Sequence, residues 1–153
     1  MDTQAEAGRN SIDYTAVAPN LIATIWPCVW EMIGRAIEGD HHEVDLGLVM
    51  HRLQSGYMQM WLVVDKEAED AIIGVVVTEI TGKVLGATCS IVILAGEQFP
   101  RWRHLIENIE DWSKSQGADE MTFRCRPGFE PLMKEYGYRR SHVILRKNLA
   151  TEN

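Results

Sequence analysis

The sequence predicts an α/β (α+β) protein with a mixed central sheet of about six strands and helices on both faces. The hydrophobic spacing is helical near the amino end and changes to apolar runs rich in valine and isoleucine in the middle of the chain. A strand that leads directly into a helix follows over residues 83–117, and then a further strand, helix and strand. A meander followed by a crossover helix and a parallel return gives a mixed sheet.

The length predicts one domain. The chain has 153 residues, enough to bury a sizeable core, and its 46% hydrophobic and 24% charged content is typical of a soluble globular protein. Residues 11–153 are expected to form this domain, and the small, polar residues 1–10 a flexible or partner-bound tail. The sequence shows neither a signal peptide nor an apolar run of membrane-spanning length, so a cytoplasmic protein is expected.

The net charge of −7 argues against a nucleic-acid or anionic-membrane binder. The charge is uneven, because residues 1–100 hold 5 basic and 14 acidic side chains and residues 101–153 hold 10 basic and 8 acidic ones. The carboxyl-terminal part is therefore the better candidate for an anionic ligand, although a solvated surface explains the same pattern. Three scattered cysteines, Cys28, Cys89 and Cys125, indicate reduced buried thiols rather than a disulfide framework or a metal site.

The first elements are a short strand and two helices. Ile12–Val17 is the predicted strand, and helical spacing from residue 20 onward ends at Gly39. Asp45 is suited to cap a second helix, which Gly56 ends. The intervening Asp40–Glu43 includes two histidines, but neighbouring side chains point in different directions, which favours a linker over a metal site.

Strands and helices alternate in the rest of the chain. The predicted meander comprises Met58–Val64, Ile72–Ile80 and Val84–Leu94, and a helix follows from near Arg101 to Gly117. The remaining elements are a strand over Met121–Arg126, a helix from Pro127 to about Tyr136, and a last strand over His142–Arg146.

This order resembles the GNAT superfamily of acyl-CoA-dependent N-acetyltransferases over nearly the whole chain. The local matches are Asp111–Asp119, which is similar to the end of the family's central helix, and Lys134–Tyr138, which is similar to the corner before its last hairpin. Together with Gln59–Trp61, these segments most resemble small GNAT-like proteins of bacteriophages. The resemblance implies a CoA pyrophosphate loop of the form R/Q-x-x-G-x-G/A between the fourth strand and the central helix.

The sequence departs from that loop at three positions, which read Glu97-x-x-Pro100-x-Trp102. Glu97 would repel a pyrophosphate, Pro100 has no N–H to donate, and Trp102 places an indole where a glycine is expected. Arg101 and Arg103 offer partial compensation through their side chains. If CoA binds, the expected contacts are Leu94, Gly96, Gln98, Arg101 and Arg103.

The catalytic positions that the resemblance implies are also incomplete. The family's general-acid tyrosine corresponds to Met133, with Tyr136 nearby at another register. Glu79 is the candidate base, although a glutamate near a strand end is more often simply solvated. Glu79 and Tyr136 are therefore the candidate catalytic residues.

Two hypotheses follow. The favoured one is a non-catalytic binding or assembly subunit with no cofactor and with protein partners, as a homo-oligomer or part of a larger assembly, in the host cytoplasm or the virion if phage-encoded. The alternative is an acetyl-CoA-dependent N-acetyltransferase that acts on a primary amine, by positioning and by an N–H near Leu94–Gly96 that polarises the thioester carbonyl.

Overall fold

The computed structural model describes residues 11–40, 45–82 and 86–150. Within them a five-stranded sheet runs in the order β1-β2-β3-β4-β5. The first four strands pair antiparallel and β5 pairs parallel with β4. The strands are β1 Ile12–Val17, β2 Met58–Asp65, β3 Ala71–Gly82, β4 Ala87–Gly96 and β5 Glu120–Phe123.

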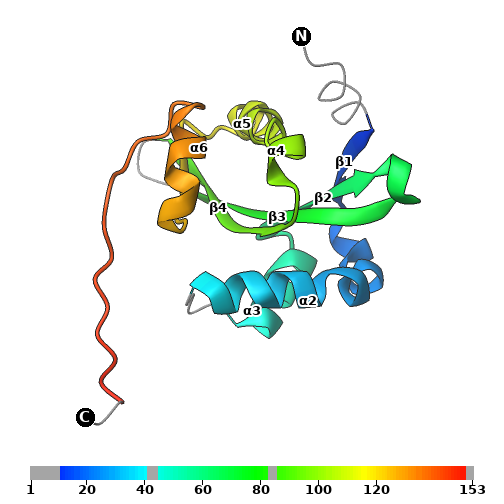
Figure 1. The fold of residues 1–153 in the computed structure, drawn as a ribbon, viewed down its shortest axis with the longest axis horizontal. Coiled ribbons are helices and arrows are strands. Elements are labelled where there is room, and N and C mark those ends of the chain that lie inside the picture. The colour runs from blue at the N-terminus through cyan, green and yellow to red at the C-terminus, as the bar shows by residue number, and fades with distance from the viewer. Residues whose placement is uncertain (1–10, 41–44, 83–85, 151–153) are drawn as a thin grey trace.

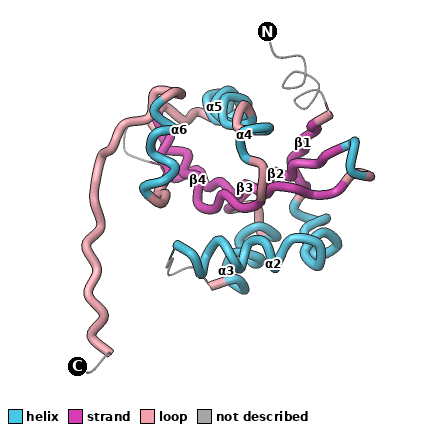
Figure 2. The backbone as a smooth tube through the Cα atoms, viewed as in Figure 1, coloured by secondary structure: helices cyan, strands magenta, loops and turns pink. Residues whose placement is uncertain are grey.

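Helices cover both faces of this sheet, so the predicted α/β class with a mixed sheet is confirmed (Figures 1 and 2). α2 and α3 lie on one face, and α4, α5 and α6 lie on the other. The helices are α2 Ile22–Asp40, α3 Leu46–Gln54, α4 Phe99–Trp102, α5 Leu105–Ser115 and α6 Glu130–Lys134. Short 3-10 turns cover Pro19–Leu21, Lys66–Ala68 and Pro127–Phe129.

The core under α2 and α3 is mainly aliphatic. The Asp45 carboxylate caps α3 by accepting the N–H groups of Gly47 at 2.6 Å and Leu48 at 3.3 Å, as predicted. Buried residues of α2 and α3 then meet alternate residues of the strands. This core comprises Ile22, Val29, Ile33, Ile37, Val49, Leu53, Met58, Met60, Leu62, Val75, Val77, Ile93 and Ala95.

The core on the opposite face is rich in aromatic side chains. Trp61 of β2 stacks edge-on against Trp112 of α5 with ring centroids 5.1 Å apart. The buried members of this core are Trp61, Val63, Ile73, Val76, Ile91, Phe99, Trp102, Leu105, Ile106, Ile109 and Met133. The two cores hold the sheet between them.

Several sequence-based boundaries differ from the structure. The single helix expected from Arg101 to Gly117 is two helices, because α4 ends at Trp102 and α5 begins at Leu105. Cys28 is exposed on α2, so the expectation of a buried thiol is wrong there, whereas Cys89 is buried as expected. The predicted tail, residues 1–10, lies outside the described residues, as does most of the Asp40–Glu43 linker.

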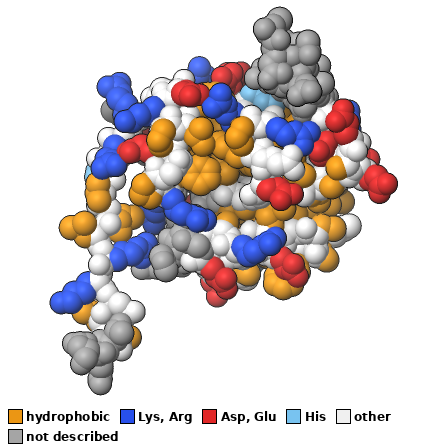
Figure 3. Space-filling model, viewed as in Figure 1, with side chains coloured by type: hydrophobic (Ala, Val, Ile, Leu, Met, Phe, Trp, Pro, Cys, Tyr) orange, Lys and Arg blue, Asp and Glu red, His pale blue; other side chains and the backbone are white. Residues whose placement is uncertain are grey.

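The largest difference is at the carboxyl end, where the strand predicted over His142–Arg146 is absent. Residues 138–148 have no regular secondary structure, and beyond Arg140, which pairs with Glu130 of α6, they extend away from the body (Figures 1 and 2). Hydrophobic side chains line this segment in full view of solvent (Figure 3). The sheet described here therefore has five strands instead of about six, because this segment does not pair with its own sheet.

Candidate functional site

Strands β4 and β5 pair over only part of their length. The last pair joins Ile91 of β4 to Phe123 of β5. Val92 is a bulge, because consecutive residues of β3 pair with Ile91 and with Ile93. Ile91 and Ile93 accordingly face opposite cores. Beyond the bulge β4 continues to Gly96 beside β3 alone, so the two parallel strands have separated.

The corner after β4 is tightly closed. Gly96 has φ +123°, and a Cβ there would lie 2.2 Å from the Ile73 carbonyl oxygen, which makes glycine necessary. The Glu97 N–H donates to that same carbonyl at 2.9 Å. The indole N–H of Trp102 donates to the Glu97 carbonyl at 2.9 Å, and the fully buried ring lies where a side chain on Gly74 would collide with it.

The start of α4 offers few free backbone donors. Gln98 precedes it with φ 59°, and Pro100 in the first turn has no N–H. The Arg101 N–H donates to the Gln98 carbonyl at 2.9 Å, and the Glu97 N–H is used in the corner contact. The geometry therefore differs from a glycine-rich loop that turns several N–H groups toward a phosphate.

Arg101 is held by groups within the protein. Its guanidinium donates to the buried Asp65 carboxylate at 2.8 Å, to Ser11 Oγ at 2.9 Å and to the Gln98 side-chain carbonyl. The hydrogen bond from Arg101 holds the pKa of Asp65 below its ordinary value, against the opposing effect of burial. The contact ties α4 to the end of β2 and to the residue just before β1.

Arg103, the second predicted phosphate contact, faces the α6 corner. Its guanidinium lies 2.9 Å from the Glu135 carboxylate and 6.0 Å from the centre of the Tyr136 ring. The structure thus brings together Arg103 and Tyr136, two of the residues predicted from the sequence. Met133, which the family resemblance aligns with a general-acid tyrosine, is buried in the core.

Aromatic rings fill the space next to the point where β4 and β5 separate. Phe129, from the 3-10 turn before α6, lies edge-on to Phe99 of α4 with centroids 5.7 Å apart. On its other side Phe129 contacts Phe123, the last residue of β5, at 5.6 Å. Phe99 also stacks edge-on against Trp102 at 4.9 Å. This chain of rings links α4 to β5.

Glu79 lies apart from this corner. It pairs with Ser90 in the β3–β4 ladder, whereas Gly96 pairs with Gly74 at the far end of the same ladder. Its carboxylate is 3.7 Å from Arg52 of α3, on the face opposite α4 and α6. The structure therefore does not bring Glu79 together with Tyr136. Leu94 packs against the aromatic-rich core.

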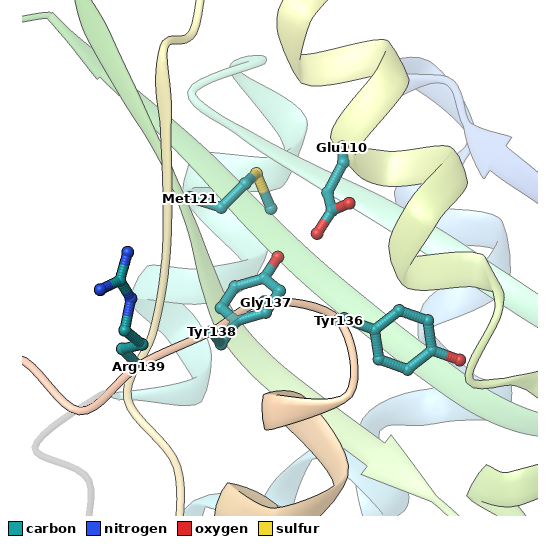
Figure 4. Close-up of a pocket in the computed structure, with 6 residues that line it drawn as sticks. All are labelled: Glu110, Met121, Tyr136, Gly137, Tyr138 and Arg139. Atoms are coloured by element: carbon teal, nitrogen blue, oxygen red, sulfur yellow. The ribbon is translucent and has the colours of Figure 1, made fainter.

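A polar hollow of about 270 Å³ lies at the β5 side of the sheet and is lined by Glu110, Met121, Tyr136, Gly137, Tyr138 and Arg139 (Figure 4). The Tyr138 hydroxyl points toward the Glu110 carboxylate of α5 (Figure 4). This hydroxyl is buried and makes no hydrogen bond within ordinary bonding geometry among the described residues. Burial raises the pKa of the Tyr138 phenol, and the Glu110 carboxylate raises it further.

Solved structures similar to this chain are acetyltransferases. An aminoglycoside acetyltransferase from an uncultured soil metagenomic sample aligns with a TM-score of 0.65 at 17% identity, over 92% of this chain and 99% of its own. A predicted acetyltransferase with acetyl-CoA from Clostridium acetobutylicum aligns at 0.63 and 14% identity, over 90% and 96% of the two chains. Glucosamine-6-phosphate N-acetyltransferase from Arabidopsis thaliana aligns at 0.63 and 14%, over 90% and 98%.

The fold is that of the GNAT acetyltransferases. This confirms the resemblance drawn from the order of elements, while identities of this size establish the fold alone. No protein-family model matches the sequence, and neither does any curated protein. Within residues 11–40, 45–82 and 86–150, no helix is long and apolar enough to cross a membrane, and no cluster of ligating side chains is suited to a metal ion.

Sequence reasoning identified the α4 corner of this GNAT fold but missed the hollow beside β5. Glu110 directly follows the buried Ile109 and so lies beside the apolar face of α5. This position was the signal in the sequence that could have pointed to the hollow. Tyr138 ends the Lys134–Tyr138 segment that carries the family resemblance, and its ring packs against the aromatic-rich core. Its polar environment depends on α5, which is distant in sequence.

Proposed function

We propose that this protein is a GNAT-fold binding or assembly subunit that does not use acyl-CoA as the catalytic members of the family do. The observation that carries the proposal is the closed corner after β4. There the Trp102 indole and the Glu97 backbone bond to each other and to β3, in the place where the family's loop presents N–H groups to a pyrophosphate.

The side chains around the corner support the same proposal. Arg101 is already bound to the buried Asp65, and Arg103 to Glu135, so a phosphate would have to compete with existing carboxylate partners. The Phe99, Phe129 and Phe123 rings occupy the space next to the strand separation. A GNAT-fold protein that has lost CoA binding and acts through protein partners would account for the closed corner, the paired arginines and the aromatic rings.

The alternative is an N-acetyltransferase that uses acetyl-CoA and a primary amine. Its support is the bulge at Val92 and the separation of β4 from β5, together with neighbours that include an acetyltransferase solved with acetyl-CoA. In that case Arg101 and Arg103 would exchange their carboxylate partners for phosphates. Glu79 and Tyr136 remain predictions as catalytic residues.

Calorimetric titration of the full chain with acetyl-CoA, and separately with CoA, tests the proposal. We expect no heat of binding at millimolar ligand, with an acetyl-CoA-binding GNAT enzyme as the positive control and circular dichroism to show that the protein is folded. Micromolar binding that is weakened in Arg101→Ala or Arg103→Ala would overturn the proposal and favour the enzyme. The expected phage origin and the cytoplasmic or virion location stay predictions.

A further inference from the structure

The polar hollow beside β5 contains a hydroxyl group without a hydrogen-bond partner. The Tyr138 hydroxyl is buried and makes no hydrogen bond of ordinary geometry among the described residues, although it points toward the Glu110 carboxylate of α5 (Figure 4). Buried polar groups in native proteins are almost always hydrogen-bonded, to the protein itself or to something bound there. The space between this hydroxyl and the carboxylate is therefore a place for a bound atom.

The two groups that face this space favour a hydrogen-bond donor with a positive charge. An ionised carboxylate only accepts hydrogen bonds, and a phenol oxygen can also accept one, so a single donor group between them can bond to both. A positive charge on the donor strengthens its bond to the carboxylate. Arg139 is the only cation among the six residues that line the hollow, and its guanidinium is directed away from Glu110 (Figure 4). The lining therefore does not place that charge beside Glu110.

The hollow also has room for a carbon chain attached to the donor. Its volume is about 270 Å³, and a second hollow of about 160 Å³ adjoins it, because Glu110 and Met121 line both. The Met121 side chain gives the shared part an apolar wall. A metal ion does not suit the site, since the described part of the chain holds no group of ligating side chains that could bind one. An amine on an alkyl stem matches both the charge and the shape.

We propose that this hollow binds a primary alkylammonium group. Its N–H groups donate to the Glu110 carboxylate and to the Tyr138 hydroxyl, and its stem lies along Met121. The Tyr136 ring forms the rim and does not hold the charge, because the Arg103 guanidinium already lies 6.0 Å from its centre. Free amines and the lysine side chain of a partner protein both carry such a group. The proposal goes beyond the function proposed above and does not depend on CoA.

The ammonium site is separate from the place where an acetyltransferase of this fold would transfer its acyl group. Met121 pairs with Cys89 of β4, and Gly96 at the closed corner lies seven residues further along that strand. At roughly 3.3 Å per residue, the separation along β4 is about 20 Å. We therefore expect an amine in the hollow to be bound without being acetylated.

Titration of the isotope-labelled full chain with n-butylamine, followed by two-dimensional NMR at neutral pH, tests the proposal. The amine is charged under these conditions, because an alkylammonium group has a pKa of about 10.4. We expect saturable shifts of the Met121 and Tyr138 amide signals, with a dissociation constant on the order of millimolar for a ligand of so few atoms. 1-Butanol has the same stem without the charge and should bind at least about tenfold more weakly.

Three variants identify the contacts. Glu110→Gln keeps the shape of the side chain but removes its charge, and it should weaken n-butylamine binding at least about tenfold. Tyr138→Phe removes the hydroxyl alone and should weaken binding about three- to tenfold. Glu107→Gln is the matched control, since Glu107 is an exposed glutamate of the same helix that does not line the hollow, and it should bind as the wild type does. The NMR spectrum of each variant shows that it is folded.

The outcomes that would overturn the proposal are distinct. No saturable shift at about 100 mM amine would leave the space to a bridging water molecule. Equal binding of 1-butanol, or unchanged binding by Glu110→Gln, would show that the hollow selects an apolar stem alone. Competition against n-butylamine by 1,5-diaminopentane and by a lysine-containing peptide distinguishes a free amine from a protein side chain. The CoA titration fails separately, because micromolar CoA binding would reject the closed-corner argument and leave amine binding unchanged.

Discussion

The two flanks of the strand pair β4 and β5 are built in opposite ways. At the end of β4 the corner is closed, with Trp102 against Gly74, Glu97 bonded to β3 and Arg101 bonded to a buried carboxylate. At β5 the described residues leave the outer edge without a strand, beside a polar hollow and a buried Tyr138 hydroxyl that makes no hydrogen bond within ordinary geometry among them. The comparison teaches that the end of β4 is sealed by packing and hydrogen bonds, whereas the outer edge of β5 carries no further strand among the described residues.

The largest expected effect is at the closed corner. Trp102→Ala should lower the free energy of unfolding by about 3–5 kcal/mol, because it removes a fully buried indole and leaves a cavity beside Gly74. Urea denaturation measures the change. Trp30→Ala is the control, since Trp30 is 45% exposed on α2 and should cost less than about 1 kcal/mol. An equal loss of unfolding free energy in Trp102→Ala and Trp30→Ala would show that the corner is not closed by Trp102.

A second substitution at the corner acts on the backbone. Gly96→Ala should cost about 1–3 kcal/mol, since its φ is +123° and the new methyl group would meet the Ile73 carbonyl oxygen. Gly128→Ala, which has no atom within 4 Å of the new Cβ, should have little effect. Thermal unfolding of both variants checks this, and an unchanged midpoint for Gly96→Ala would show that the corner is not tightly closed.

The Asp65–Arg101 contact predicts a smaller, pH-dependent effect. The folded-state pKa of Asp65 is depressed, so its contribution is complete above the ordinary value of 3.8 and is lost as the pH falls through the lower folded-state pKa. Asp65→Asn should therefore reduce stability at neutral pH and flatten the acid limb of the stability curve. Urea midpoints from pH 2 to pH 7 measure this, with the exposed Asp13→Asn as the control. If the stability of Asp65→Asn fell with acid as steeply as that of the wild type, the result would contradict the Asp65–Arg101 contact.

The smallest expected effect belongs to the open edge. Tyr138→Phe should change stability by less than about 1 kcal/mol at neutral pH, because the hydroxyl makes no hydrogen bond of ordinary geometry among the described residues. Because burial raises the pKa of the Tyr138 phenol in the folded protein, stability falls as the pH rises above the ordinary value of 10.0, and the variant should tolerate alkali better. Tyr57→Phe, which changes an exposed tyrosine, should not alter the tolerance of alkali. A large loss at neutral pH would indicate a hidden partner.

Hydrophobic periodicity predicted most of the elements and the GNAT-like order. It placed β1 at its observed bounds and predicted helices in the regions of α2 and α5. Periodicity reports which residues prefer an apolar neighbour, and that preference is local. The three departures at Glu97, Pro100 and Trp102 were likewise visible, because each is a property of the residue itself.

Only the tertiary structure decided what those residues contact. The carboxylate partners of Arg101 and Arg103, and the meeting of Glu110 with Tyr138, join segments distant in sequence, so no local pattern encodes them. The same limit explains the strand predicted over His142–Arg146. Its apolar alternation is a local property and is present, but a strand exists only where an edge accepts its hydrogen bonds, and in the structure this segment leads away from its own sheet.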